Sequence, residues 1–164
     1  MKNISIIVAI AKNNAIGKNN ELLWHISDDL KRFKKYTTNN VVIMGKNTFL
    51  SLPKGALPNR KNIVITDNKT DKFENTDVVF SIDEAIEKAS TEKENFIIGG
   101  GMIYKQFLPL ANKLYLTQID KEFDADTFFP DINFDEWKLD YEEFVEKSEK
   151  NQFSHSFKIF SRIK

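Results

Sequence analysis

The sequence predicts an α/β fold: a single domain over residues 1–164 with a central, mixed, mostly parallel β-sheet, an antiparallel C-terminal strand and helices on both faces. Three observations lead to this prediction. Short, uniformly apolar runs alternate with helical patterns, as in parallel sheets that are covered on both faces. The final segment instead alternates in polarity, as a half-buried antiparallel strand does. The length fits one ordinary domain, and no linker, repeat or low-complexity segment divides it.

Six apolar runs account for the predicted strands that precede the final segment. They cover residues 4–11, 41–44, 62–66, 78–80, 96–98 and 113–119. Residues 153–163 carry Phe, His, Phe, Ile, Ser and Ile at every second position, which predicts an antiparallel strand added at an edge. The acidic stretch 135–149 is expected to form a solvated connector and strand.

Helical patterns lie between these strands. Ser27 can cap a helix that has Leu30 and Phe33 on one face. Ser81 and Glu84 have the spacing of a capping box, which predicts a second helix at this point.

A third short helix is expected over residues 102–108, ended by Pro109. Residues 12–26, between the first strand and the first helix, form an unusually long connection that is rich in Asn and Gly. Long structured loops in compact domains are often lids or binding loops.

Composition excludes several classes of function. Lys plus Arg and Asp plus Glu both total 24, so the formal charge is zero, and neither nucleic acid nor a membrane is an expected partner. There is no cysteine and there are only two histidines, so disulfides, thiolate chemistry and catalytic zinc are not expected. The first segment lacks a signal-peptide pattern, and no apolar run approaches the length of a membrane span. We therefore expect a cytoplasmic protein and a monomer.

Two glycine motifs follow predicted strands and precede predicted helices. Residues 98–101 read Ile-Gly-Gly-Gly, and residues 44–48 read Met-Gly-Lys-Asn-Thr. Glycine lets the backbone approach a ligand closely, and the start of a helix favours an anion. Each motif alone is equally consistent with a tight strand-to-helix turn, and Lys46 with a solvated surface lysine. Two such sites at neighbouring strand ends suit a dinucleotide better than either alone.

A possible acid–base centre lies near the start of the first helix. Asp29 is surrounded in sequence by apolar residues, which makes it a candidate acid or hydrogen-bond acceptor. The alternative is an ordinary first-turn acid that complements the helix dipole, which is our interpretation of Asp28. Thr117, in the strand predicted over 113–119, matters only if its hydroxyl reaches Asp29.

Together these motifs resemble the dihydrofolate reductase family, of the bacterial chromosomal type, from Ile4 to Arg162 without a large gap. The matching segments, in chain order, are Ile16-Gly17, Trp24 with Asp29, Val42-Ile43-Met44-Gly45 with Thr48, Leu57 to Asn62, Ile98-Gly99-Gly100-Gly101 with Tyr104, Leu114 to Thr117, and Asp126-Thr127 with Phe129-Pro130. One such motif would be weak evidence, but the ordered set at family spacing is specific.

The resemblance implies that NADPH reduces 7,8-dihydrofolate to tetrahydrofolate, with hydride passing to pterin C6 while N5 gains a proton. Asp29 would hold the pterin through a ring nitrogen and the 2-amino group. Thr117 would hydrogen-bond that carboxylate, Trp24 would bind an ordered water beside it, and Leu22 would lie on a loop that closes over the nicotinamide. Antifolate inhibitors, including diaminopyrimidines, are implied ligands of the same site.

The resemblance also implies a binding surface for each ligand. For the substrate, Asp29, Thr117 and the Arg60 guanidinium, which would bind the glutamate α-carboxylate, would be joined by an apolar slot of Ile7, Val8, Phe33, Leu52, Leu57 and Ile98. The residues implied for NADPH are Ala9, Ile16, Gly17, Gly45, Lys46, Asn47, Thr48, Thr66, Ile98, Gly99, Gly100, Gly101, Met102 and Tyr104. The family pattern also predicts a cis peptide between Gly99 and Gly100.

Several residues depart from the family pattern. Leu23 stands where relatives usually have proline, so the loop is expected to open more often. Asn59 replaces a frequent glycine, which we interpret as a tolerated turn change. Lys46 and Met102 stand where some relatives carry arginine, and Asp67 lies where the 2′-phosphate of NADPH is expected. We therefore predict a preference for NADPH over NADH that is weaker than is usual in the family.

Two alternatives of different kinds remain. One is another pterin or pyrimidine reductase, such as those of riboflavin synthesis, which would not require Trp24, Asp29, Thr117 and Arg60 together. The other is a catalytically silent nucleotide-binding module, which would keep the glycines and lose Asp29. Oxidation of NADPH with dihydrofolate, before and after methotrexate is added, separates all three.

Overall fold

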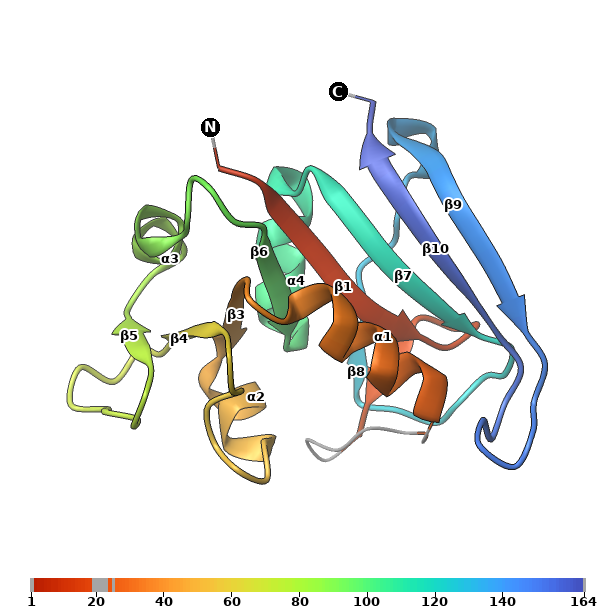
Figure 1. Ribbon diagram of the computed structural model, residues 1–164, viewed down its shortest axis with the longest axis horizontal. Coiled ribbons are helices and arrows are strands. Elements are labelled where there is room, and N and C mark those ends of the chain that lie inside the picture. Colours follow the sequence, from red (N-terminus) through yellow and green to blue (C-terminus); the bar gives the residue numbers. More distant parts are fainter. Residues whose placement is uncertain (1, 19–23, 25, 164) are drawn as a thin grey trace.

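The computed structural model describes residues 2–18, 24 and 26–163, and Figure 1 shows how they are arranged. One sheet has eight strands, in the order β5-β4-β3-β6-β1-β7-β10-β9. Its strands are β1 (Ile4–Ile10), β3 (Val41–Gly45), β4 (Lys61–Ile65), β5 (Asp77–Val79), β6 (Asn95–Gly99), β7 (Lys113–Ile119), β9 (Trp137–Val145) and β10 (His155–Arg162). A small antiparallel pair joins β2 (Ala15–Gly17) to β8 (Thr127–Phe128).

Four α-helices and two 3₁₀ turns connect these strands. They are α1 (Ser27–Thr37), α2 (Lys46–Ser51), α3 (Ile82–Lys88), α4 (Gly101–Phe107), η1 (Leu108–Leu110) and η2 (Phe134–Glu136). All pairings from β5 to β7 are parallel, whereas β10 pairs antiparallel with both β7 and β9. The predicted fold class is therefore confirmed.

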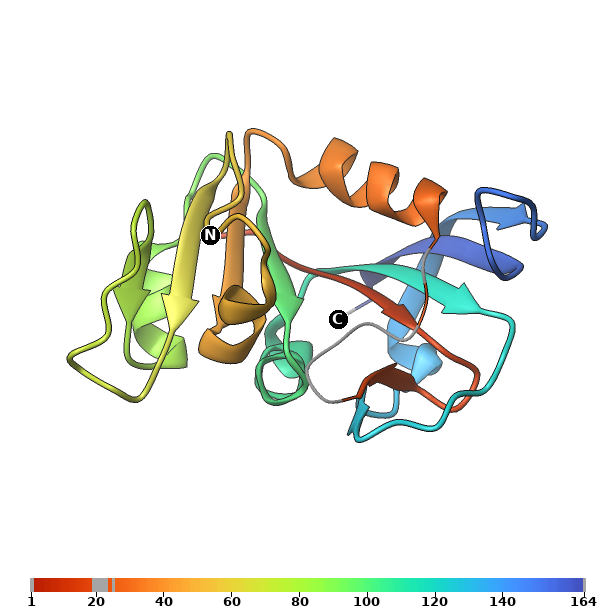
Figure 2. The ribbon, with the colours of Figure 1, turned by 90° about the horizontal axis from the view of Figure 1, so that it is seen from below.

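The sheet separates two apolar layers, with α1 on one face and α3 and α4 on the other (Figure 2). Phe33 and Tyr36 of α1 pack against one cluster, which contains Ile7 of β1. Phe107 of α4 belongs to another cluster, which contains Val8 of the same strand. Because neighbouring residues of β1 point to opposite faces and both faces are buried, the strand reads as a continuous apolar run.

The chain leaves two neighbouring strands in opposite directions. From β1 it passes to α1 on one face, and from the adjacent β6 it passes to α4 on the other face. Such a change of direction opens a crevice at the carboxyl ends of the strands, where ligands bind in open α/β sheets. This end of the sheet carries both glycine motifs and Ala9.

The predicted strands are all present, with ends displaced by one or two residues. The assignment of the last strand to an edge is wrong, because β10 lies between β7 and β9, and β9 forms the edge. The acidic stretch contributes a strand, β9, as expected, and its side chains on both faces are exposed apart from Trp137 at its start and the half-buried Val145 at its end. This exposure explains why the sequence of the stretch is acidic.

One predicted helix cap is confirmed and one is wrong. The Ser81 hydroxyl accepts a hydrogen bond from the Glu84 backbone N–H at 3.0 Å, as expected. Ser27 is the first residue of α1, and the cap position is Ile26, which has no capping side chain. Leu30 does not share a buried face with Phe33 either, because half of its surface is exposed.

The third predicted helix ends one residue earlier than expected, and part of the long connection lies outside the described part of the chain. Helix α4 ends at Phe107, and Pro109 lies inside the following 3₁₀ turn. Leu22, Leu23 and His25 fall outside the described residues. In the described part of the chain, no helix is both long enough and apolar enough to cross a membrane.

Candidate active site

Asp29 and Thr117 meet at the carboxyl end of the sheet. The Thr117 hydroxyl donates a hydrogen bond of 2.5 Å to Asp29 Oδ1, across 88 residues of sequence. Thr117 lies on β7 opposite Ala9 of β1, so the sheet fixes its position. Asp29 lies in the first turn of α1, and its side chain is 23% exposed. The condition that gives Thr117 a role, contact with Asp29, is therefore met.

The neighbouring Asp28 has a structural role. Asn151 accepts a hydrogen bond from the Asp28 backbone N–H and donates one of 2.8 Å to Asp28 Oδ2. The bond from Asn151 is the main cause that lowers the pKa of the Asp28 carboxyl. These contacts tie α1 to the segment that precedes β10, and they turn the Asp28 side chain toward Asn151.

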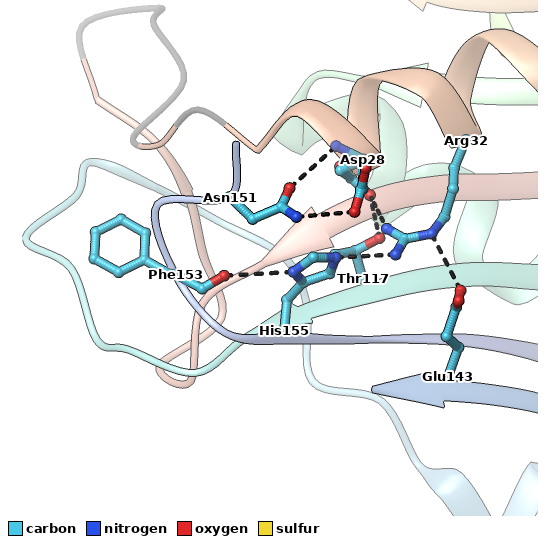
Figure 3. Close-up of polar contacts among 8 residues, drawn as sticks. Asp28, Arg32, Thr117, Glu143, Asn151, Phe153 and His155 are labelled. Atoms are coloured by element: carbon cyan, nitrogen blue, oxygen red, sulfur yellow. Dashed lines mark hydrogen bonds and ion pairs between the residues drawn. The ribbon is translucent and has the colours of Figure 1, made fainter. Parts of the chain in front are cut away.

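Asp29 also contacts a guanidinium that the sequence analysis did not consider. Arg32 Nη1 lies 3.4 Å from Asp29 Oδ1, and Arg32 Nη2 lies 3.0 Å from His155 Nε2 (Figure 3). Arg32 Nε lies 3.7 Å from a Glu143 carboxylate oxygen on β9. The i, i+3 spacing of Asp29 and Arg32 is the one signal of this contact in the sequence, and on helices that spacing is most often a solvated surface pair.

Trp24 closes one side of this region. Its ring is buried and packs against Phe123 with centroids 5.3 Å apart. Ala9 packs against the same small cluster, which also contains Ile26 and Ile119. The loop after β1 is thereby anchored to the end of β7.

An apolar wall lies on the α1 side of the sheet. Five of the six residues expected in the substrate slot belong to one apolar cluster or pack against it: Ile7, Phe33, Leu52, Leu57 and Ile98. Val8 is not among them, because its side chain points to the opposite face of β1, toward the cluster that contains Tyr104.

Arg60 is held in a fixed orientation on the chain segment that follows Leu57. Its Nε donates to the Pro58 carbonyl and its Nη1 to the Thr37 hydroxyl, both at 2.9 Å. Burial lowers the pKa of this guanidinium, which nevertheless stays protonated at neutral pH. Asn59 adopts a left-handed conformation with φ of 60°, which Asn tolerates well, so it replaces a glycine here without difficulty.

The two glycine motifs lie against each other. Met44 and Gly99 are partners in the pairing of β3 with β6. The peptide between Gly99 and Gly100 is cis, which confirms the prediction. A Cβ on either glycine would lie 3.3 Å from the Thr48 hydroxyl, and one on Gly101 would lie 2.8 Å from the Thr127 methyl group. Side chains at these positions would therefore crowd Thr48 and Thr127, so the close packing of the chain itself favours glycine here.

Tyr104 fixes the strand beside this turn. Its hydroxyl donates a hydrogen bond of 3.0 Å to the Ile7 carbonyl. Burial, with a smaller contribution from the charge of Asp29, raises the pKa of the Tyr104 phenol well above its ordinary value. Tyr104 is therefore a neutral donor whose ring lies against Gly99.

Residues of the short strand β2 complete the same edge. Ala15 pairs with Phe128 and Gly17 with Thr127, and Thr127 is the residue that limits space at Gly101. Ile16 packs against the main apolar cluster. The loop residues expected near the nicotinamide, Ile16 and Gly17, are thus brought next to the triple-glycine turn.

Lys46 is engaged by an acidic residue. Its ammonium lies 2.9 Å from Asp71 Oδ2, and the Thr66 hydroxyl donates to the same oxygen at 2.6 Å. The bond from Thr66, followed by that from Lys46, lowers the pKa of the Asp71 carboxyl. Asp67 is exposed, as is Met102, and Asn47 lies in the first turn of α2. Asp71, four residues beyond the expected acid, is therefore the carboxylate that meets Lys46.

These contacts create a cleft edge suited to an extended anionic cofactor. The glycine cradle, formed by residues 99–101, brings bare backbone next to the Thr48 hydroxyl. The Lys46 cation follows the end of the neighbouring strand β3, and Thr66 follows the end of β4, the next strand along. Among the described residues, no cluster of three or more His, Cys, Asp or Glu side chains is arranged to hold a metal ion.

Comparison with known proteins agrees with this geometry. Residues 3–162 match the model of the family described as dihydrofolate reductase. The dihydrofolate reductase of Staphylococcus haemolyticus is 42% identical over 161 residues, which cover 98% of this chain and 96% of the relative. The chain belongs to the dihydrofolate reductase family. The Haemophilus influenzae dihydrofolate reductase is also 42% identical, over 160 residues that cover 96% of this chain and 98% of the relative.

A solved dihydrofolate reductase has the same fold. The Enterococcus faecalis enzyme, in a complex with NADP(H) and RAB-propyl, superposes with a TM-score of 0.90 at 33% identity. The superposition covers 99% of this chain and 97% of that one. The matches extend across both strands that flank the crevice, so the site described above lies wholly within the shared dihydrofolate reductase domain.

Proposed function

We propose that this member of the family reduces 7,8-dihydrofolate to 5,6,7,8-tetrahydrofolate with NADPH, placing a hydride on pterin C6 while N5 gains a proton. The observation that carries the proposal is the hydrogen bond between Asp29 and Thr117. It lies at the end of the sheet that also carries the apolar wall and the triple-glycine turn. A silent nucleotide-binding module has no use for a carboxylate in that position.

Asp29 holds and orients the substrate. Thr117 and Arg32 both contact Oδ1, and Oδ2 has no hydrogen-bond partner among the described residues. The carboxylate can therefore accept two donors from the pterin, a ring N–H and the 2-amino group, in a charge-assisted pair. Its negative charge favours protonation of the substrate, and water that reaches N5 delivers the proton.

The rest of the substrate lies along the apolar wall. Ile7, Phe33, Leu52, Leu57 and Ile98 cover its rings, and Val8 contributes through its backbone. Arg60 binds the glutamate α-carboxylate at the far end. Pro58 and Thr37 accept from its Nε and Nη1, and no described residue accepts a hydrogen bond from Nη2, which can bind a ligand. The orientation of the guanidinium exists before the substrate arrives, which lowers the entropic cost of binding.

NADPH, when bound, supplies the hydride. Backbone groups of Ala9 and Ile16, with Gly17 and Tyr104, would hold the nicotinamide end. Gly45, Lys46, Asn47 and Thr48 and the turn from Ile98 to Met102 would hold the pyrophosphate side, and Thr66 would serve the adenosine end. Trp24 would help to exclude water from the reacting rings and would retain one ordered water beside the substrate, and the same shielding role is proposed for Leu22.

The same site binds competing ligands. A protonated diaminopyrimidine or methotrexate offers two donors to the Asp29 carboxylate, so antifolates compete with dihydrofolate. We also propose that the protein works as a monomer in the cytoplasm, and in support every described residue of the site comes from one chain.

The replacement of Asp29 by Asn tests this function. Asp29→Asn keeps the size of the side chain and removes its charge and one acceptor. We expect kcat/KM at neutral pH to fall by about a hundredfold or more, a typical scale for acid–base contributions. Activity is expected to recover in part at low pH, where the substrate can arrive already protonated. The measurement is the pH profile of hydride transfer, followed by NADPH absorbance.

Asp28→Asn is the matched control. It makes the same chemical change one residue earlier, on a side chain bound to Asn151, and is expected to leave the profile close to that of the wild type. Thermal melts of both variants establish that they are folded. Near-normal neutral activity in a folded Asp29→Asn protein would overturn the role of Asp29 and most of this mechanism.

A further inference from the structure

Arg32 is an unusual neighbour for a substrate-binding carboxylate. Its side chain is only 12% exposed, yet it carries a permanent positive charge. Four groups surround it: the Asp29 carboxylate, the His155 ring, the Glu143 carboxylate and the face of Phe157, whose centroid lies 4.9 Å from the guanidinium carbon. These groups come from α1, β9 and β10, so the guanidinium is fixed by tertiary structure. Figure 3 shows its polar contacts with His155 and Glu143.

His155 determines which way the guanidinium points. An arginine only donates hydrogen bonds, so the bond from Arg32 Nη2 requires an unprotonated Nε2 on His155. The proton then lies on Nδ1, which faces the Phe153 carbonyl at 3.4 Å. Burial, followed by the charge of Arg32, lowers the pKa of His155 and keeps the ring neutral. The neutral ring holds Nη2, which leaves Nη1 directed at Asp29.

The contact with Asp29 is one-sided. Arg32 and Thr117 both act on Oδ1, so the carboxylate is held from one side and presents Oδ2 to the crevice. The other ionisable groups in this region are Asp28 on α1, Glu143 on β9, His155 on β10 and the neutral Tyr104 phenol on α4. The ammonium groups of Lys31 and Lys150 act on Asp28, and Arg32 is the cation in contact with the Asp29 carboxylate itself.

We infer that Arg32, oriented by His155, is a positioning residue that holds the Asp29 carboxylate for the substrate and sets the pH range of hydride transfer. The inference rests on the proposed function. It extends that function by a residue which touches neither substrate nor cofactor in the scheme above and which acts through Asp29.

The sign of the effect follows from charge alone. Hydride transfer requires one additional proton on the pair formed by Asp29 and the substrate, whether that proton lies on N5 or on the carboxylate. A fixed positive charge next to the pair disfavours the additional proton. Arg32 therefore moves the midpoint of the pH profile to lower pH, and its removal moves the midpoint to higher pH.

The experiment measures hydride transfer in single turnovers from about pH 5 to about pH 9, with NADPH bound and dihydrofolate added. Arg32→Met removes the charge and keeps most of the length of the side chain. We expect its midpoint to rise by on the order of one pH unit, the lower end of the shifts caused by a charge within a few ångströms. Arg32→Lys keeps the charge and is expected to restore most of the wild-type midpoint.

Two further variants act as controls on neighbouring groups. Glu143→Gln removes a negative charge beside Arg32 and is expected to lower the midpoint by a smaller amount, since Glu143 is more exposed and contacts the guanidinium from the far side. His155→Gln keeps an acceptor for Nη2 and removes the titrating ring, so its midpoint is expected to stay near that of the wild type.

The outcomes distinguish three cases. A raised midpoint in Arg32→Met, with rescue by Arg32→Lys, supports the inference. An equal loss of rate at every pH with an unchanged midpoint overturns it and leaves Arg32 a structural role. If Arg32→Met does not fold, the shift in Glu143→Gln decides, and no shift there overturns the inference. The proposed function fails separately, if the wild type does not oxidise NADPH with dihydrofolate or if Asp29→Asn is fully active.

Discussion

The imidazole of His155 is completely enclosed, and this has a consequence for stability. Burial, followed by the Arg32 charge, lowers its pKa below the ordinary value of 6.5. As the pH falls through that value, the unfolded chain binds a proton at this residue while the folded protein does not. The stability contributed by the neutral ring is therefore fully present above pH 6.5. It decreases as the pH falls below 6.5, and the decrease ends once the pH is below the lowered pKa of the folded protein, where the ring is protonated in both states.

We predict that the free energy of unfolding falls with decreasing pH in this window by up to about 1.4 kcal/mol per pH unit for this one site. Urea unfolding of the wild type and of His155→Gln, compared at several pH values, measures the effect. His25, the only other histidine, is present in both proteins and cancels in the difference. Parallel stability curves for the two proteins would contradict the prediction.

The sequence identifies a residue of the site when its role is tied to a local motif. Asp29 and Thr117 belong to ordered motifs of the family, and their contact confirms the condition placed on Thr117. Arg32 and His155 are separated by 123 residues, and each has an ordinary local pattern. Nothing in a single sequence pairs them, because the contact depends on how β10 lies beside α1.

At the scale of elements, apolar runs predict strands well because both faces of the parallel sheet are buried. Their ends are less certain, since pairing with a neighbour decides where a strand stops. Strand β10 was predicted at the edge because one of its faces is polar, but β9 pairs beyond it. The cap at Ile26 was missed because an N-cap without a capping side chain leaves no residue-type signal.

The loop between β4 and β5 determines how strongly the Lys46 ammonium can bind a phosphate of the cofactor, because Asp71 on this loop pairs with it. Asp71 on this loop accepts hydrogen bonds from Thr66 and Lys46, as a 2′-phosphate would. In dinucleotide-binding folds the adenosine ribose lies at the carboxyl end of the next strand after the glycine turn. In this chain that strand is β4, which follows the turn at Gly45. A carboxylate there competes with the phosphate for Lys46 and is compatible with a free 2′-hydroxyl.

We therefore predict an NADPH preference weaker than is usual in the family, and a gain in Asp71→Asn. That change removes the competing charge, so NADPH is expected to bind roughly fivefold more tightly, the upper end of the effect of an ion pair that solvent can reach. The dissociation constant for NADH is expected to change little. Equilibrium binding at fixed salt measures both, and Asp67→Asn, on an exposed neighbouring acid, should have a smaller effect. An equal change for both cofactors would count against Asp71.

At the scale of the whole molecule, the order of strands could not be derived from the sequence, although the fold class could. The order depends on which way each crossover turns: α1 covers one face where the chain passes from β1 to β3, and α3 and α4 cover the other face where it returns through β6 to β7. The adjacency of the glycine motifs could be foreseen from the residues alone, because parallel strands end at a common edge. The Asp29–Thr117 contact was expected only from the family resemblance.

The continuous sheet predicts that residues 1–164 unfold as one unit. The two tryptophans report on distant regions: Trp24 lies in the small cluster at the site, and Trp137 lies in the main core beside Phe160. Trp24→Phe and Trp137→Phe each leave a single tryptophan, whose fluorescence can be excited selectively. Because both clusters pack on strands of the same sheet, we expect fluorescence and circular dichroism to give one urea midpoint within each variant.

That midpoint is also expected to be independent of protein concentration, because a monomer gains no stability by mass action. It is expected to rise when NADPH is added at saturation, because the cofactor binds the folded protein and not the unfolded chain. The comparison is made within each variant, since either substitution by itself lowers stability. A fluorescence midpoint that differs from the dichroism midpoint in one variant would show two folding units. A midpoint that rises with protein concentration would instead indicate an oligomer, and with it a contribution to the fold from outside this chain.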